Sequence, residues 1–192
     1  RMMSLSFTPD SNEVTFVQML YDPEYGGRYE QVNPQVENLV NPTLSIQSVN
    51  IYTSELRELA TGTTPRWDSS GRYLSFKNQD LRYYIDPLQA EFNNYLMVLD
   101  TVTGARYPIC PFAMGMIYTR FSPDSQYIYC SKRAQDVAPG VGTQLYRCPV
   151  TGGEWEQISF IQDNTWNIAN YIMPSPDGNL LFYTKMWNIP TE

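Results

Sequence analysis

Hydrophobic and polar residues follow the same order in four separate stretches of the chain. Each stretch starts with a short apolar run, passes through a polar turn and resumes with apolar residues at alternate positions. The runs before the turn end at Phe7, Trp67, Phe121 and Pro174, so consecutive units are 60, 54 and 53 residues apart. A regular period in this range predicts a repeat architecture.

The polar turns have the composition that reverses a chain between two strands. They read "TPDS" from Thr8, "DSSG" from Asp68, "SPDS" from Ser122 and "SPDG" from Ser175. Proline presets φ, Asp or Ser accepts backbone hydrogen bonds, and Gly or Ser follows where the chain reverses. Because alternate residues of a strand share one face, each second strand places two side chains together. These pairs are Val14 and Phe16, Leu74 and Phe76, Ile128 and Cys130, and Leu181 and Tyr183.

Third and fourth strands follow in the first three units. The segments 45–62, 94–104 and 143–153 share a glycine-containing end, which we align: Gly62 in the first, Gly104 in the second, and Gly152 and Gly153 in the third. Fourth strands are expected over 55–60, 105–110 and 154–159. Each unit is therefore expected to be a four-stranded antiparallel meander of about 55 residues, the kind of sheet that repeats radially in a β-propeller.

The pattern thus predicts an all-β fold: a β-propeller of four-stranded antiparallel blades, of which about three and a half are present. We expect one propeller segment over 1–192, with blades roughly at 1–62, 63–112 and 113–160 and a partial blade at 161–192. Propellers close with four to eight blades, and open sheet edges promote aggregation. We therefore expect part of a larger ring, with the remaining blades on the same or another chain. Two alternatives are an assembly of several copies that completes one ring and a compact sandwich.

The repeats resemble a known group of propellers. The combination of an aromatic residue with Ser-Pro-Asp-Gly, an apolar strand and a later Asp-x-x-Thr-Gly is similar to the blades of TolB-type propellers and of prolyl oligopeptidases and dipeptidyl peptidases. The residues that carry the resemblance are Phe121–Ser125, Pro174–Gly178, Leu99–Gly104 and Val150–Gly152. The resemblance covers nearly the whole chain, and it is specific for the fold rather than for the function.

The amino-acid composition argues against several classes of function. The net charge of −7 argues against nucleic-acid binding, which needs a basic surface. No apolar run reaches the roughly 18 residues that a membrane span needs. Histidine is absent, so no Ser-His-Asp or Cys-His nucleophile system and no histidine-based metal site is complete within these residues. We expect no cofactor and no metal ion.

The three cysteines, Cys110, Cys130 and Cys148, do not have the spacing of a zinc or redox motif. We interpret them as small buried side chains. Since Cys130 and Cys148 fall in strands predicted to be neighbours, a disulfide between them is the alternative.

The connections on one side of the predicted blades are long and rich in tyrosine. They run from about Leu20 to Thr43, from Asn78 to Asn94 and from Lys132 to Thr143, and such lengths are uncommon unless the loop is functional or disordered. Tyrosine and arginine are enriched at binding hot spots, so we predict a contact surface for a protein, peptide or glycan. Its candidate residues are Tyr25, Arg28, Tyr29, Arg82, Tyr83, Tyr84 and Asp86. The alternative is that these tyrosines fold inward and pack the loops onto the rim.

Carboxylates are candidates for catalysis only if two of them meet across a pocket. Six lie in the long loops, and their spacing selects no pair: Asp22, Glu24, Glu30, Asp80, Asp86 and Glu91. By contrast, Asp10, Asp124 and Asp177 recur with the blades and are interpreted as turn caps. We therefore lean against an enzyme within this stretch.

Three functions remain as expectations. The first, implied by the TolB resemblance, is a non-catalytic scaffold that binds a protein or peptide in the periplasm or outside the cell. The second is the gating propeller of a serine peptidase, whose nucleophile would lie in an α/β-hydrolase domain elsewhere. The third is a carbohydrate-active propeller, although similarity to oligogalacturonate lyases would imply histidine metal ligands that these residues lack.

Overall fold

The structure is a computed structural model that describes residues 2–20, 43–78, 95–111, 119–133, 143–160 and 169–185. These residues form β-strands joined by turns, with no helix among them. The strands are β1 (Met2–Phe7), β2 (Glu13–Leu20), β3 (Thr43–Asn50), β4 (Leu56–Thr61), β5 (Thr63–Trp67), β6 (Tyr73–Asn78), β7 (Tyr95–Asp100), β8 (Arg106–Pro111), β9 (Thr119–Phe121), β10 (Tyr127–Arg133), β11 (Thr143–Pro149), β12 (Glu156–Gln157), β13 (Ala169–Pro174) and β14 (Leu181–Lys185).

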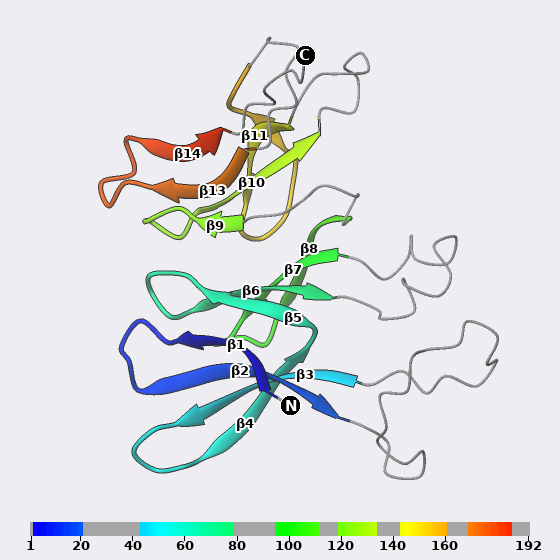
Figure 1. The fold of residues 1–192 in the computed structure, drawn as a ribbon, viewed down its shortest axis with the longest axis vertical. Coiled ribbons are helices and arrows are strands. Elements are labelled where there is room, and N and C mark those ends of the chain that lie inside the picture. The colour runs from blue at the N-terminus through cyan, green and yellow to red at the C-terminus, as the bar shows by residue number, and fades with distance from the viewer. Residues whose placement is uncertain are drawn as a thin grey trace, which may run out of the picture.

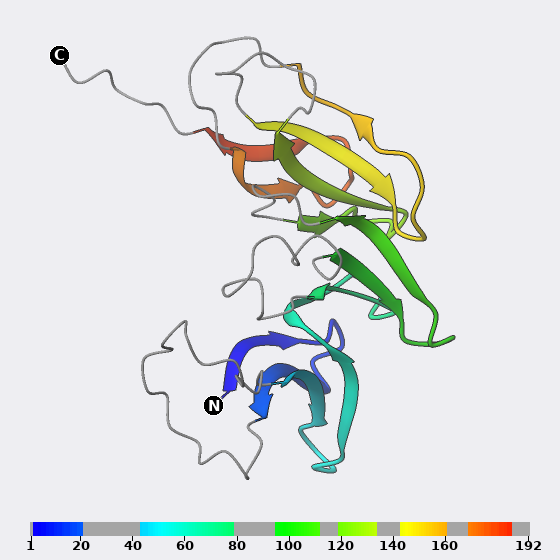
Figure 2. The ribbon, with the colours of Figure 1, turned by 90° about the vertical axis from the view of Figure 1, so that its right-hand side faces the viewer.

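The strands form four separate antiparallel sheets in chain order. Blade 1 is β1-β2-β3-β4, blade 2 is β5-β6-β7-β8, blade 3 is β9-β10-β11-β12, and blade 4 is the pair β13-β14. Figure 1 shows the sheets following one another from the N-terminal blue blade to the C-terminal red pair. Figure 2 shows the same order from the side. Three four-stranded blades and two strands of a fourth confirm the predicted fold class.

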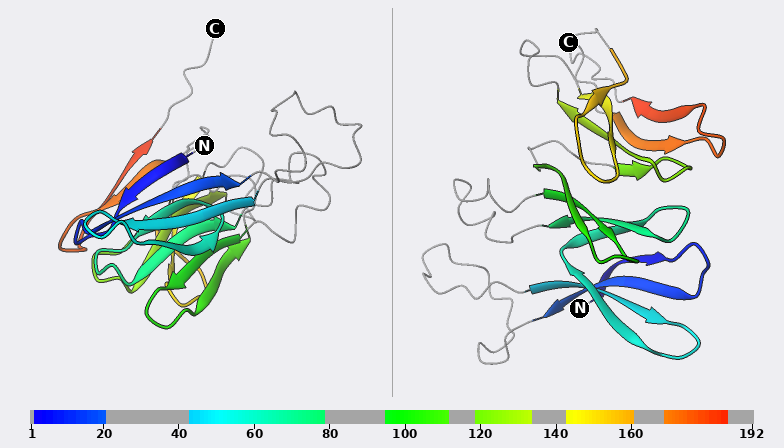
Figure 3. Two further views of the ribbon diagram at one scale, coloured as in Figure 1. Left: turned by 90° about the horizontal axis from the view of Figure 1, so that it is seen from below. Right: turned by 180° about the vertical axis from the view of Figure 1, so that it is seen from behind.

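The first strand of each blade lies where neighbouring blades approach each other. β5 contacts β1, β2 and β3 of blade 1, and β13 contacts β9, β10 and β11 of blade 3. The two views of Figure 3 show the later strands of each blade fanning away from its first strand, as in the blades of a propeller. Among the described strands, blades 1 and 4 do not meet, so the sheets form an open arc.

The hydrophobic core lies between blades. We call the side of a blade that packs on the next blade its forward face and the opposite side its backward face. Because sequence-alternate residues share a face, the forward face of blade 1 presents Val17, Ile46 and Ala60 to Leu74 and Phe76 on the backward face of blade 2. The equivalent contact of blades 2 and 3 contains Leu96, Val98, Ile109, Phe121, Ile128, Cys130, Tyr146, Cys148 and Val150. Between blades 3 and 4 it contains Leu145, Tyr129, Ile158, Ile172 and Leu181.

A bulge recurs at the same place in three of the first strands. The register of β1, β5 and β13 shifts three residues before the strand ends. In each case a residue other than glycine takes a positive φ: Ser4 (55°), Thr64 (52°) and Tyr171 (56°). A bulge bends its strand and increases the local twist. The sequence pattern did not predict this feature, because nothing in the residue types marks it.

The turn between the third and fourth strands corrects one predicted alignment. In blade 2, Asp100 Oδ1 accepts hydrogen bonds from the backbone of Val102 and Thr103, and Gly104 takes φ 75°. In blade 1, Asn50 Oδ1 accepts from Tyr52 and Thr53, and Ser54 takes φ 59°. The equivalent of Gly104 is therefore Ser54, and the alignment with Gly62 was wrong.

Gly62 serves a different purpose, at the connection from blade 1 to blade 2. A Cβ atom on this residue would lie 2.3 Å from the carbonyl oxygen of Lys77, and its φ is 150°. Glycine is thus required there by close approach of the backbone rather than by a hairpin turn.

Blade 3 has a shorter outer strand than the pattern predicted. β12 spans only Glu156 and Gln157, because the flanking residues use other partners. The indole Nε1 of Trp155 donates to the carbonyl oxygen of Ile109 in blade 2 at 3.2 Å. Ser159 Oγ accepts from the backbone nitrogen of Leu145 at 2.8 Å. Side-chain hydrogen bonds therefore replace part of the sheet ladder.

Cys130 and Cys148 are buried thiols in the core between blades 2 and 3. Their strands are neighbours as predicted, but Cys130 lies opposite Tyr146 and Cys148 lies opposite Ile128. The disulfide that the neighbouring strands suggested is not formed, and both side chains serve as packing residues.

Candidate binding face

The connections of the blades differ at the two ends of the strands. Short turns at residues 8–12, 68–72, 122–126 and 175–180 join the first strands to the second strands, and we call this side the tight-turn end. The second strands β2, β6 and β10 run away from it, as Figure 1 shows. The opposite side, where they end at Leu20, Asn78 and Arg133, is the long-loop end.

Antiparallel pairing brings the ends of two long segments together. β2 pairs with β3 and β6 pairs with β7, so segments 21–42 and 79–94 both leave from the long-loop end of adjacent blades. The predicted site residues lie within these two segments, outside the described residues: Tyr25, Arg28, Tyr29, Arg82, Tyr83, Tyr84 and Asp86. The six candidate loop carboxylates lie there as well. The structure places the roots of both segments but does not test the residues themselves.

Two cations lie on the inner strands of blade 2, Lys77 near the long-loop end and Arg66 closer to the tight-turn end. Lys77 lies on β6, and Arg66 lies on the neighbouring strand β5. Both side chains are partly buried. Burial lowers the pKa of Lys77, and the positive charge of Arg66 lowers it further. Arg120 occupies the position in β9 that corresponds to Arg66, one residue before the aromatic that ends the strand. This recurrence of arginine before an aromatic residue is visible in the sequence as Arg66-Trp67 and Arg120-Phe121.

The tight-turn end is built from a repeated hydrogen-bonded box. In blade 1, Thr8 Oγ1 donates to Asp10 Oδ1 at 2.6 Å and accepts from the backbone nitrogen of Glu13 at 3.0 Å. Ser122 with Asp124, and Ser175 with Asp177, make the same contacts. The Asp carboxylates also accept a backbone hydrogen bond from Asn12, Gln126 and Asn179, respectively.

These contacts explain the electrostatics of the three turns. The hydroxyl hydrogen bond from Thr8 holds the pKa of Asp10 below its ordinary value. The hydroxyls of Ser122 and Ser175 lower the pKa of Asp124 and Asp177 in the same way. A carboxylate held in its charged form by its own turn is a cap, as the recurrence of these residues predicted, rather than a proton donor.

Blade 2 forms the box with the two side chains exchanged. Asp68 occupies the position that Thr8 and Ser122 hold in the other blades, and its Oδ1 accepts a hydrogen bond from the backbone nitrogen of Tyr73 at 2.8 Å. Ser70 occupies the position of Asp10 and Asp124. Its hydroxyl donates a hydrogen bond to the Asp68 carboxylate and accepts one from the backbone nitrogen of Arg72 at 3.2 Å. The turn "DSSG" therefore reproduces the contacts of "SPDS" with the opposite order of residue types.

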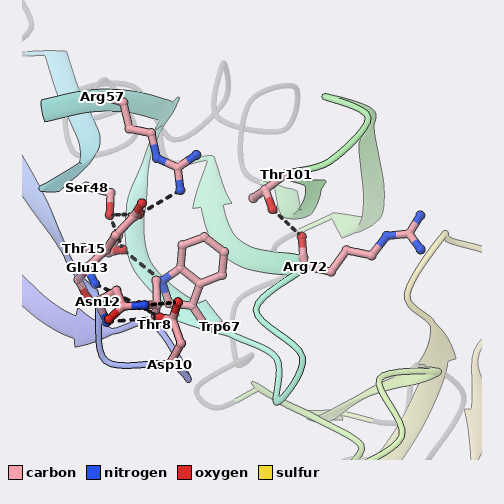
Figure 4. A network of polar contacts seen from close by, with 10 residues as sticks. All are labelled: Thr8, Asp10, Asn12, Glu13, Thr15, Ser48, Arg57, Trp67, Arg72 and Thr101. Atoms are coloured by element: carbon pink, nitrogen blue, oxygen red, sulfur yellow. Dashed lines mark hydrogen bonds and ion pairs between the residues drawn. The ribbon is translucent and has the colours of Figure 1, made fainter. Parts of the chain in front are cut away.

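A polar network joins blades 1 and 2 near the tight-turn end (Figure 4). Trp67 Nε1 donates to Thr15 Oγ1 at 2.9 Å, and Thr15 Oγ1 lies 3.3 Å from Ser48 Oγ. Ser48 Oγ and Arg57 Nη2 both donate to Glu13 Oε2 at 2.7 Å. Each of these contacting atoms has a partner within the network, so the network fits a structural role.

A second charged contact stiffens the same end of blade 2. Arg72 donates twice to Asp100 Oδ2, at 2.7 and 3.2 Å. This ion pair, together with the turn amides, holds the pKa of the buried Asp100 well below its usual range. Figure 4 also shows Thr101, whose hydroxyl donates to the carbonyl oxygen of Arg72 at 2.8 Å. The charges of Arg72 and Asp100 are thus paired within one blade.

The described segments contain no group of three or more Cys, Asp and Glu side chains arranged to hold a metal ion. No helix in the same segments is long and apolar enough to cross a membrane.

Comparison with known proteins supports the fold. No protein-family model matches the chain, and no curated protein matches it. TolB from Acinetobacter baumannii superposes with a TM-score of 0.57 at 15% identity, covering 95% of this chain and 37% of that one. The β-propeller domain of the trilobed protease from Pyrococcus furiosus gives 0.58 at 11% identity, covering 96% and 50%. Oligogalacturonate lyase from Vibrio parahaemolyticus gives 0.60 at 14% identity, covering 94% and 46%.

These similarities define the class of protein: the chain is a β-propeller segment. Its blades are similar in structure to those of TolB and of a peptidase propeller, which confirms the resemblance seen in the sequence. The chain spans between 37% and 50% of the three relatives described above. At such low identity the similarity establishes the fold and leaves the function to be argued from the residues.

Proposed function

We propose that the chain is a non-catalytic propeller module that binds a protein or peptide through its long-loop end. The observation that carries this proposal is the asymmetry of the blades. Two long, tyrosine-rich segments, 21–42 and 79–94, leave from the same end of adjacent blades, whereas the other end is closed by hydrogen-bonded turns of five or six residues. Binding residues are commonly carried by loops on a rigid scaffold.

The chemistry of the proposed surface suits a polypeptide. Tyrosine provides a large contact area at low entropic cost, and arginine adds directed hydrogen bonds.

Similarity to TolB supports a scaffold role and a periplasmic or extracellular location, by analogy only. Similarity to a protease propeller supports a second candidate, a gating propeller that accompanies a hydrolase domain. That candidate requires a Gly-x-Ser-x-Gly elbow elsewhere in the natural protein. Similarity to an oligogalacturonate lyase supports a carbohydrate-binding role less well, because the chain has no histidine.

The test begins with a partner isolated on the immobilised chain from extracts of the source organism. Its affinity is then measured for the wild type and for a variant with Tyr25, Tyr29, Tyr83 and Tyr84 changed to Ala. We expect a loss of at least about tenfold, because truncating even one hot-spot side chain to alanine costs about 1–2 kcal/mol or more of binding free energy. Tyr52→Ala is the matched control, since Tyr52 is an exposed tyrosine at the tight-turn end. Unchanged affinity in the fourfold variant would remove the proposed surface.

A further inference from the structure

Positive charge is concentrated on the inner strands of blades 2, 3 and 4, that is, on the first and second strand of each. The sequences of these strands contain no Asp or Glu, and their Lys and Arg residues are Arg66, Lys77, Arg120, Lys132, Arg133 and Lys185. The whole chain, by contrast, carries 20 acidic and 13 basic residues. The inner strands thus reverse the charge balance of the chain, which favours an anion as their ligand.

Arg66 and Lys77 face the same way, toward blade 3. Arg66 lies opposite Ser75 on β6, and Lys77 follows Ser75 by two residues, so all three share one face of blade 2. Lys77 lies opposite Leu96, which belongs to the core between blades 2 and 3, so this face is the forward face. Phe121 of blade 3 packs against the same core. The two cations therefore lie between two blades within the arc.

The two like charges act on each other in a partly buried position. Burial, and then the positive charge of Arg66, lower the pKa of Lys77. The ion pairs of the described residues do not include Arg66, because they join Arg57 to Glu13, Arg72 to Asp100 and Arg147 to Glu156. Neighbouring cations that disfavour each other's charged form are typical of sites that receive an anion.

We propose that Arg66 and Lys77 bind the carboxylate group of a ligand on the forward face of blade 2. The planar guanidinium matches the two oxygen atoms of a carboxylate, and the ammonium group adds a compact positive charge. Arg120, the other arginine of the first strands, is drawn to its own backbone, since its Nη1 donates to the carbonyl oxygen of Thr119 at 3.0 Å. The site uses no residue of segments 21–42 and 79–94, so it can fail while the proposed function stands.

A nuclear magnetic resonance titration of the 192-residue chain with succinate, at neutral pH and constant ionic strength, tests the proposal. We expect saturable shifts of the backbone amides of β5 and β6. Arg66→Gln and Lys77→Gln should each weaken binding by about tenfold or more, because a hydrogen bond to a charged group contributes at least that much. Lys77→Arg should retain most of the affinity, because it keeps the charge. Arg106→Gln is the matched control, since Arg106 is an exposed arginine on the outer strand β8 of the same blade.

A tripeptide with a free C-terminal carboxylate, compared with its amidated form, distinguishes two sources of the carboxylate group. Binding of the free peptide but not of its amide assigns the end of a polypeptide as the ligand. Binding of succinate without binding of the peptide assigns a small free acid. Both results support the site.

Three outcomes overturn the proposal. Absence of saturable binding for both succinate and the free peptide would exclude the site. Equal affinity in the wild type, Arg66→Gln and Lys77→Gln would place the binding elsewhere. Tighter binding of inorganic phosphate than of either carboxylate probe would assign a different ligand. Far-UV circular dichroism verifies that each variant is folded, and Lys77→Met replaces Lys77→Gln if that variant does not fold.

Discussion

The indole nitrogen of Trp67 in blade 2 donates a 2.9 Å hydrogen bond to the hydroxyl of Thr15 in blade 1. Thr15 is fully buried and connects in turn to Ser48. Trp67 also packs against the core between these blades. One side chain therefore adds directional specificity to a contact that is otherwise hydrophobic, and it fixes how the two blades are aligned.

Trp67→Phe should lower the free energy of unfolding by about 1–2 kcal/mol, because the ring is kept in part but the donor is lost. Phe is a sensible replacement, since Phe121 occupies the equivalent position in blade 3. Urea unfolding measures the change. In a Thr15→Val background the same substitution should cost less, as a double-mutant cycle detects. Equal costs in both backgrounds would show that packing, and not the hydrogen bond, carries the effect.

In the tight turn of blade 2 the carboxylate and hydroxyl side chains, Asp68 and Ser70, have exchanged positions. This exchange predicts that the stability of the turn depends more on the presence of both side chains than on their order. Asp68→Ala should destabilise by about 1–3 kcal/mol, since it leaves the backbone amide of Tyr73 without the acceptor that the buried Asp68 provides. The double variant Asp68→Ser with Ser70→Asp recreates the order found in blades 3 and 4 and should lie within about 1 kcal/mol of the wild type. Thermal unfolding compares the three proteins. A double variant as unstable as Asp68→Ala would show that the turn of blade 2 needs its own order.

The hydroxyl–carboxylate boxes predict a loss of stability in acid. The folded-state pKa values of Asp10, Asp124 and Asp177 lie below those of the unfolded chain. Their contribution is therefore complete above the unfolded value of about 3.9 and is lost as the pH falls through the lower folded values. Ser122→Ala should raise the pKa of Asp124 toward its ordinary value, while the pKa of Asp177 should stay unchanged. Carbon NMR of the carboxyl groups during a pH titration measures both, and an unmoved Asp124 would contradict the box.

Two glycines with positive φ should respond differently to alanine. At Gly104 a Cβ atom would meet nothing within 4 Å, so Gly104→Ala costs only the left-handed conformation, about 1 kcal/mol. At Gly62 the same atom would meet Lys77 and Phe76 at 2.3 and 2.8 Å. Gly62→Ala should therefore destabilise by at least about 2 kcal/mol more than Gly104→Ala. Denaturant unfolding of both variants tests the order, and the reverse order would argue against the close approach at Gly62.

The fold was predictable from the sequence because the residues that repeat in each blade interact mainly with their neighbours in the chain. Phe7, Trp67, Phe121 and Pro174 end their strands as expected, since the turn that follows each of them forms its own hydrogen bonds. The sequence did not reveal Ser54 as the residue of blade 1 that is equivalent to Gly104 of blade 2, because serine rarely adopts a positive φ. The bond from Trp67 to Thr15 could not be foreseen, because it joins residues whose distance depends on how the blades pack. The proposed site residues stay predictions, since they lie outside the described segments.

Hydrogen–deuterium exchange of the chain with and without its isolated partner tests the central claim most directly. The claim is that the long-loop end binds and that the tight-turn end supports the blades. We predict slower exchange on binding in segments 21–42 and 79–94 and at the adjoining ends of β2 and β6, with no change in the turns at 8–12, 68–72 and 122–126. Protection of those turns without protection of the two long segments would contradict the account.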